Sequence, residues 1–183
     1  MAERWPKEVG IPFHAQMRWE MTVGKGGKKR LDLVKEAGGF GITLAIEAAD
    51  PTIRKEILDR AMPEEMIFEG MQNVVDRGFK VRTEQITGLP YGATSKPTKM
   101  NLDADLQLLE LNVRLKEETG GPTMAWASTL APYKGTKMGT YCAQYGHYES
   151  DNNDVPDTFF ESSVLRFPKE WIGPDLEKRK NDS

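Results

Sequence analysis

The pattern of apolar and polar residues switches along the chain between the period of a strand and the period of a helix. Residues 11–21, IPFHAQMRWEM, alternate at every second position, with His14, Gln16 and Arg18 on one side of the predicted strand. Residues 28–39, KKRLDLVKEAGG, have the spacing of a short helix and end on two glycines. The chain therefore begins its regular structure with a strand followed by a helix.

The same order repeats through the middle of the chain. Residues 40–48, FGITLAIEA, form an apolar run rich in β-branched residues, which is typical of a strand covered on both faces. Helical spacing follows at residues 51–78, either as one helix or as two. A third strand is predicted at residues 79–90, where Arg82 and Glu84 share one face.

A further helix and strand extend the pattern. Residues 102–121 carry apolar side chains at helical spacing, which predicts one apolar face on this helix. These apolar positions are Leu102, Leu106, Leu109 and Val113. Residues 123–133, TMAWASTLAPY, then form the fourth predicted strand and run into a turn.

Alternation of strands and helices at this spacing predicts a parallel sheet with right-handed crossovers. We expect an α/β fold, a partial (β/α) barrel of about four parallel strands with crossover helices, over residues 1–137. Residues 138–183 are expected to form an irregular C-terminal extension that packs on the barrel and ends in a disordered tail. Four strands are about half of a closed barrel, so another chain or self-association is expected to cover the open edges.

Composition narrows the function classes. The net charge of −3 argues against a groove that binds nucleic acid, because such grooves usually carry clustered Lys and Arg. The single cluster of basic residues is GKGGKKR at residues 24–30. We interpret this basic cluster as a solvent-exposed loop and the start of a helix, since it lacks the spacing of a phosphate-binding loop. No run approaches the roughly 18 apolar residues of a membrane span, and the N-terminus lacks the apolar core of a signal peptide, so a cytoplasmic protein is expected.

The few metal-binding side chains are widely spaced. Cys142 is the one cysteine, which excludes an internal disulfide and a four-iron cluster held by cysteines of this chain alone. His14 and His147 are the only histidines and have no partners at ligand spacing. No catalytic residue and no metal ligand is assigned to this sequence.

Five segments in order resemble the radical S-adenosylmethionine (radical SAM) proteins, in particular the branch with an N-terminal cobalamin-binding domain. They are IPFHAQMR, ITLAIEAADPTIRKEILDR, GFKVRTEQITGLP, AWASTLAPYKGT and VPDTFFESSVLRFP. The resemblance covers about residues 4–170. It implies a partial barrel whose strand ends hold a [4Fe–4S] cluster and S-adenosylmethionine. In that family, reductive cleavage of S-adenosylmethionine gives a radical that abstracts hydrogen from a substrate, and cobalamin-dependent members carry out methyl transfer or rearrangements.

The sequence departs from this family at its cluster-binding end. The CxxxCxxC motif, the first two barrel strands and the cobalamin domain are absent, and MAERWPKEVG matches the helix before the third strand. Residues 88–94, GLPYGAT, replace the family's GLPGET, and residues 48–50 replace its small polar pair and Asn. We therefore expect the C-terminal half of a radical SAM enzyme, either a fragment or one subunit of a split enzyme, inactive in isolation. The [4Fe–4S] cluster and any cobalamin would come only through a missing region or partner chain. The alternative is a catalytically inactive, degenerate barrel half that acts as a structural or assembly subunit.

Candidate cofactor-binding residues lie on the predicted interior face and at strand ends. They are Gln16, Arg18, Glu47, Arg82, Glu84 and Ser128. Glu47 ends a strand, where barrel enzymes place their chemistry, so it either contacts S-adenosylmethionine or pairs with an arginine. The residues on the interior face line the cofactor chamber or form a structural ion-pair network. Trp126 faces the same chamber or, as the favoured interpretation, lies in the core.

Overall fold

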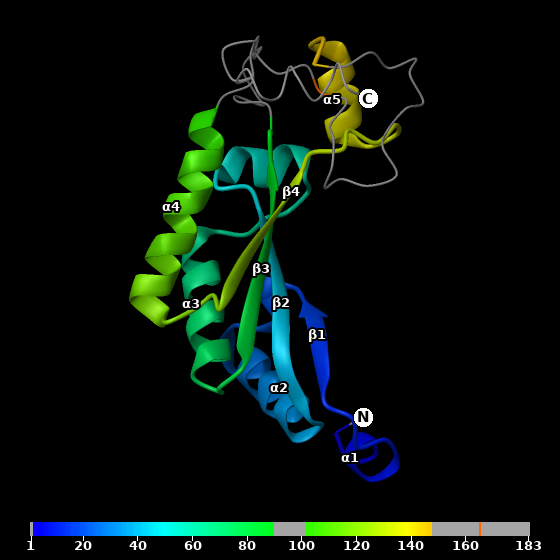
Figure 1. Cartoon of the computed structure of the whole chain (residues 1–183), viewed down its shortest axis with the longest axis vertical. Coiled ribbons are helices and arrows are strands. Elements are labelled where there is room, and N and C mark those ends of the chain that lie inside the picture. The colour runs from blue at the N-terminus through cyan, green and yellow to red at the C-terminus, as the bar shows by residue number, and fades with distance from the viewer. Residues whose placement is uncertain (1, 90–101, 148–164, 166–183) are drawn as a thin grey trace, which may run out of the picture.

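The computed structural model describes residues 2–89, 102–147 and 165, and within this part the chain forms one parallel sheet (Figure 1). The strands are β1 (Phe13–Met17), β2 (Gly39–Glu47), β3 (Lys80–Thr87) and β4 (Met124–Thr129). They pair in the order β1-β2-β3-β4, and every pair is parallel. The predicted α/β fold with four parallel strands is thereby confirmed. The predictions for residues 90–94, in the loop after β3, and for the C-terminal tail lie outside the described residues.

Helices cover one face of this sheet (Figure 1). The crossover helices are α2 (Gly24–Glu36), α3 (Glu64–Val75) and α4 (Leu102–Thr119). Shorter elements are α1 (Trp5–Glu8), η1 (Trp19–Met21), η2 (Ile53–Ile57) and α5 (Lys137–Gln144). The helical pattern predicted at residues 51–78 is thus two elements, η2 and α3, because the chain leaves helical geometry between them.

The main core lies between the sheet and these helices. Ile42, Leu44 and Ile46 alternate along β2 and are completely buried. They pack with Leu31 of α2, residues of α3 and three leucines of α4. Because side chains alternate across a strand, the intervening residues of β2 face away from the helices. The second face of the sheet is therefore free of helical cover in the described chain.

A second, smaller core lies where the strands end. Leu130, directly after β4, packs with Met138, Tyr141 and Cys142 of α5. The same cluster includes Ile53 of η2, so it joins the segments that follow β2 and β4. The division of the chain at residue 137 stays a prediction. None of the described helices is both long enough and apolar enough to cross a membrane.

The apolar face of α4 differs from the predicted one. The side chains buried against the sheet are Ala104, Leu108, Leu111 and Leu115. Leu106, Leu109 and Val113, three of the residues predicted to form the apolar face, are exposed. The prediction was wrong because α4 carries two apolar stripes, and spacing alone does not distinguish the stripe that faces the sheet.

Alanine substitutions at two adjacent leucines test this assignment of faces. Leu108 is 3% exposed and Leu109 is 60% exposed. We expect Leu108→Ala to lower the free energy of unfolding by about 2–4 kcal/mol and Leu109→Ala by less than about 0.5 kcal/mol. Urea denaturation followed by circular dichroism measures both. Equal losses would contradict the orientation of α4.

Candidate functional site

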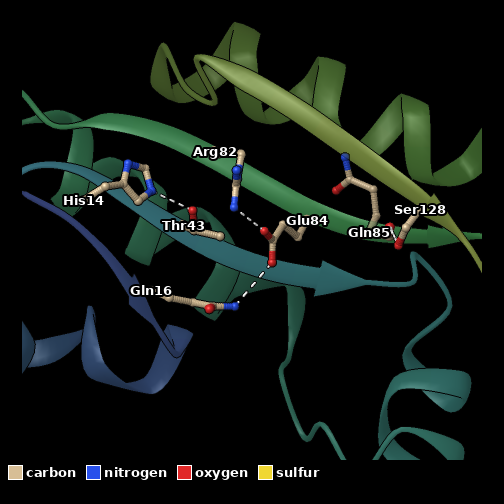
Figure 2. A network of polar contacts seen from close by, with 7 residues as sticks. All are labelled: His14, Gln16, Thr43, Arg82, Glu84, Gln85 and Ser128. Carbon is tan, nitrogen blue, oxygen red and sulfur yellow. Dashed lines mark hydrogen bonds and ion pairs between the residues drawn. The ribbon is translucent and has the colours of Figure 1, made fainter. Parts of the chain in front are cut away.

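The open face of the sheet carries a polar network that spans three strands (Figure 2). Gln16 of β1 donates through Nε2 to Oε2 of Glu84 at 3.3 Å, across β2. The β2 residue in register with Glu84 is Ala45, whose short side chain leaves room for this contact. Arg82 donates to the other carboxylate oxygen of Glu84 at 2.5 Å. The structure therefore brings together three of the predicted site residues.

The Arg82 guanidinium also links β3 to β4. Its central carbon lies 4.6 Å from the ring centroid of Trp126, in a cation–π contact. Trp126 is 39% exposed, so the favoured prediction that it lies in the core was wrong. It shares the open face because β3 and β4 pair with Glu84 opposite Trp126. Among the described residues, the buried Nε of Arg82 has no hydrogen-bond partner.

His14 makes a separate polar contact on the same face, nearer the amino-terminal ends of the strands (Figure 2). Its Nε2 lies 2.6 Å from Oγ1 of Thr43 on β2. The imidazole packs on Gly41, where an added Cβ would lie only 2.5 Å from Nδ1, so a larger residue at this position would displace the imidazole. Burial lowers the pKa of His14, the nearby Arg82 lowers it further, and Glu84 acts in the opposite sense. A neutral imidazole is therefore favoured.

Glu47 stands at the carboxyl end of β2 in an unusual backbone conformation. Its φ of 67° lies in the left-handed region, which non-glycine residues adopt at a cost. Its Oε1 pairs with Nη2 of Arg60 at 3.1 Å. Burial raises the pKa of the Glu47 carboxyl, Arg60 opposes this, and Glu84 raises it again. Pairing with an arginine, one of the two alternatives for Glu47, is thus present, while contact with a cofactor stays a prediction.

A cavity of about 590 Å³ lies beyond the carboxyl ends of β3 and β4. Ser128 lines it, together with Ile86, which is the residue opposite Ser128 in the β3–β4 register. Its other lining residues include the aliphatic side chains Ile57, Leu58 and Leu130. Lys137 and Asp59, both exposed, form an ion pair of 2.5 Å within the lining. The site therefore combines a polar wall on the open face with a more apolar cavity at the strand ends.

The structure separates the predicted site residues into groups. Gln16, Arg82 and Glu84 form the network, whereas Glu47 and Ser128 lie at the carboxyl ends of their strands. Arg18 is exposed and makes no side-chain hydrogen bond or ion pair with other described residues. The pairing of β1 with β2 ends at Met17, the residue before it, and a cofactor-binding role of Arg18 stays a prediction.

The sequence pattern does not predict Arg60 as the partner of Glu47. It comes after the turn of η2, and no periodic pattern links the two positions. Within the described residues, no group of three His, Cys, Asp or Glu side chains gathers as a metal site. Cys142 is fully buried, and burial raises the pKa of its thiol to about 12.

Comparisons with known proteins bear on the fold. No protein-family model matches the chain. A curated relative, the cytidylyl-2-hydroxyethylphosphonate methyltransferase of Streptomyces wedmorensis, is 21% identical over 173 residues. A solved structure, the coproporphyrinogen III oxidase HemN of Escherichia coli, described as a radical SAM enzyme, superimposes with a TM-score of 0.55 at 14% identity. The fold resembles part of a radical SAM barrel.

Coverage is uneven in both comparisons. The alignments include 93% and 94% of this chain but only 30% of the methyltransferase and 31% of HemN. The chain therefore spans about a third of the length of either protein. At these identities the matches support the fold, and membership of the radical SAM superfamily stays a prediction. The cobalamin branch and the fragment or split-subunit status stay predictions.

Proposed function

We propose that this chain supplies the carboxyl-terminal part of a radical SAM barrel and lines the chamber for S-adenosylmethionine and substrate. The observation that carries the proposal is the polar open face, which ends at the cavity beyond β3 and β4. Carboxyl ends of parallel strands are where barrel enzymes bind ligands. The [4Fe–4S] cluster, and cobalamin if the enzyme uses it, would be held by a segment outside this sequence or by a partner chain.

The residues present fit S-adenosylmethionine. Its amino-acid end carries an ammonium and a carboxylate, its ribose carries hydroxyls, and its adenine is flat and largely apolar. Glu47 offers a carboxylate at the strand end, and the buried Nε of Arg82 is a donor without a partner in the described chain. The cavity beside Ser128 offers aliphatic side chains for the adenine. S-Adenosylmethionine, reduced at the cluster, would supply a carbon radical that abstracts hydrogen.

The chain's own residues would bind and orient ligands. Glu84 is engaged by Gln16 and Arg82, and Arg82 is stacked on Trp126, so the polar wall is ordered before a ligand arrives. Such an ordered wall lowers the entropy lost on binding. Glu47 remains the carboxylate at the strand end, with Arg60 as its counter-charge.

A structural or assembly subunit is the second candidate. The observation that favours it is that β1 and β4 are both edge strands, each paired on one side only in the described sheet. Another protein segment or a second copy of the chain would cover these edges and the open face. Native mass spectrometry of the protein from its own source distinguishes the candidates. A complex containing iron and sulfide supports the enzyme, whereas an iron-free homo-oligomer supports the structural subunit.

Ser128 gives a direct test of the cofactor site. In the complex isolated from the source, we expect Ser128→Leu to weaken binding of S-adenosylmethionine at least about tenfold, because the larger side chain occupies the cavity. Equilibrium dialysis with labelled S-adenosylmethionine measures the affinity. Ala125→Leu is the matched control: it introduces the same leucine side chain on the same strand at an exposed position outside the cavity lining. Unchanged affinity in the Ser128 variant would refute the assignment.

A further inference from the structure

Arg54 is the most deeply buried charged side chain described in the structure. Only 1% of it is exposed, and burial lowers its pKa, although arginine keeps its charge. A buried charge is costly unless its donors are used, and an apolar side chain of similar volume is often as stable or more stable. An arginine at this buried position therefore calls for a role beyond packing.

The Arg54 guanidinium holds the segment that follows Glu47. Its Nη1 donates to the carbonyl oxygens of Ala48 at 2.7 Å and Ala49 at 2.9 Å. These are the first two residues after Glu47, whose left-handed backbone turns the chain out of β2. Two hydrogen bonds from one guanidinium thus fix the carbonyls next to the strained residue.

The main chain of Arg54 holds the partner of Glu47. Its carbonyl oxygen accepts a 2.7 Å hydrogen bond from the backbone N–H of Arg60. The turn between them is wide, since the N–H of Leu58 bonds to the carbonyl of Ile53, five residues back. Such π-type turns are rare and occur frequently at functional sites. One residue therefore anchors both sides of the Glu47–Arg60 ion pair.

We propose that Arg54 is a positioning residue that sets the Glu47–Arg60 pair at the carboxyl end of β2. The value of this pair for ligand binding rests on the proposed function, but the positioning itself does not. Replacing the Arg54 side chain removes its two hydrogen bonds to the carbonyls after Glu47 and leaves the main-chain bond to Arg60 in place. It should therefore uncouple Glu47 from Arg60 even in a chain that remains folded. A purely structural arginine would change stability and leave the coupling intact.

The test measures how the Glu47 carboxyl responds to loss of Arg60. NMR titration of the full chain, with Glu47 assigned by its Glu47→Gln variant, follows the carboxyl pKa. In the otherwise unchanged chain, Arg60→Met should raise that pKa by about one unit, because an opposite charge is removed. In an Arg54→Met background, the same substitution should shift it by less than a third as much. An equal shift in both backgrounds overturns the proposal.

Two further variants exclude general destabilisation. Arg77→Met is the matched control, because Arg77 also donates to a backbone carbonyl, that of Asn73 at 2.9 Å, far from Glu47 in the fold. It should leave the response to Arg60→Met unchanged. Arg54→Lys keeps the charge and a donor, and it should restore part of the response.

If Arg54→Met does not fold, NMR of Arg54 in the unsubstituted protein tests the proposal. The Arg54 guanidinium should show slow hydrogen exchange and slow rotation in ¹⁵N NMR spectra, because Nη1 is held by two carbonyls. Fast exchange and rotation would overturn the proposal. Binding of S-adenosylmethionine is measured in parallel. An intact coupling in a protein that does not bind this cofactor would refute the proposed function and leave the positioning role standing.

Discussion

Replacing Trp19 by alanine is expected to lower the free energy of unfolding by about 3–5 kcal/mol. Trp19 is 1% exposed and joins three elements. Its indole N–H donates to the carbonyl of Ala45 on β2 at 2.8 Å. Its ring lies against α3 at Gly70, where an added Cβ would lie 3.0 Å from the ring. Alanine would leave a cavity between sheet and helices and an unpaired carbonyl, and urea denaturation measures the loss.

Trp126 is the matched control for this substitution. Trp126→Ala removes the same side chain from the open face of β4, where the tryptophan is partly exposed and stacked with Arg82. The expected cost is about 1 kcal/mol, the size of a cation–π contact with partial burial. Comparable losses in the two variants would mean that the open face is covered like the core, in conflict with the described fold.

Much of the fold can be predicted from the spacing of apolar and polar residues along the chain. The run of residues 40–48 predicts a covered strand, and β2 is one of the two inner strands and contributes Ile42, Leu44 and Ile46 to the core. The period of two along β3 predicts that Arg82 and Glu84 share one face, opposite Val81, Thr83 and Gln85, and the structure shows it. These features are local, because a strand's period decides which side chains share a face.

The features that the sequence pattern does not predict depend on contacts between segments that are distant along the chain. Trp126 faces the open side because of its register with Glu84, which the pattern of β4 alone does not give. The exposed stripe of α4 has the same spacing as its buried stripe, so only the position of the sheet decides between them. Arg54 and Arg60 gain their roles from the wide turn of η2, and no periodic pattern predicts such a turn.

Replacing Glu47 is expected to stabilise the fold and to weaken ligand binding. The Glu47 side chain is 18% exposed, and burial raises its carboxyl pKa above the unfolded value. Above the unfolded pKa the native state therefore binds more protons than the unfolded state, and stability falls as pH rises through the folded pKa. Glu47→Gln removes this cost, so the variant should be more stable than the parent at pH 7. The difference should disappear below about pH 4, where the carboxyl is protonated in both states.

The backbone of Glu47 adds a second, pH-independent contribution. Glu47→Gly should be more stable than Glu47→Gln by about 1 kcal/mol, because glycine adopts a φ of 67° without steric cost. The difference between these two variants should be the same at pH 4 and pH 7, because neither carries a carboxyl at position 47. Thermal unfolding across this pH range measures both variants, and a Glu47→Gln variant less stable than the parent at pH 7 would contradict the argument.

Measurements of ligand affinity distinguish a Glu47 carboxylate that binds a ligand from one that only occupies a strained turn. A charge-assisted hydrogen bond to a ligand contributes about 1.5–3 kcal/mol, so both Glu47 variants should bind S-adenosylmethionine about 10–100-fold more weakly in the complex. A side chain that costs stability at its own position and yet contributes to affinity is typical of a binding site. If both variants are more stable and bind S-adenosylmethionine as tightly as the parent, Glu47 is no cofactor ligand. The strained strand end would then mark only a turn inherited with the barrel, and the structural subunit would become the better account of the chain.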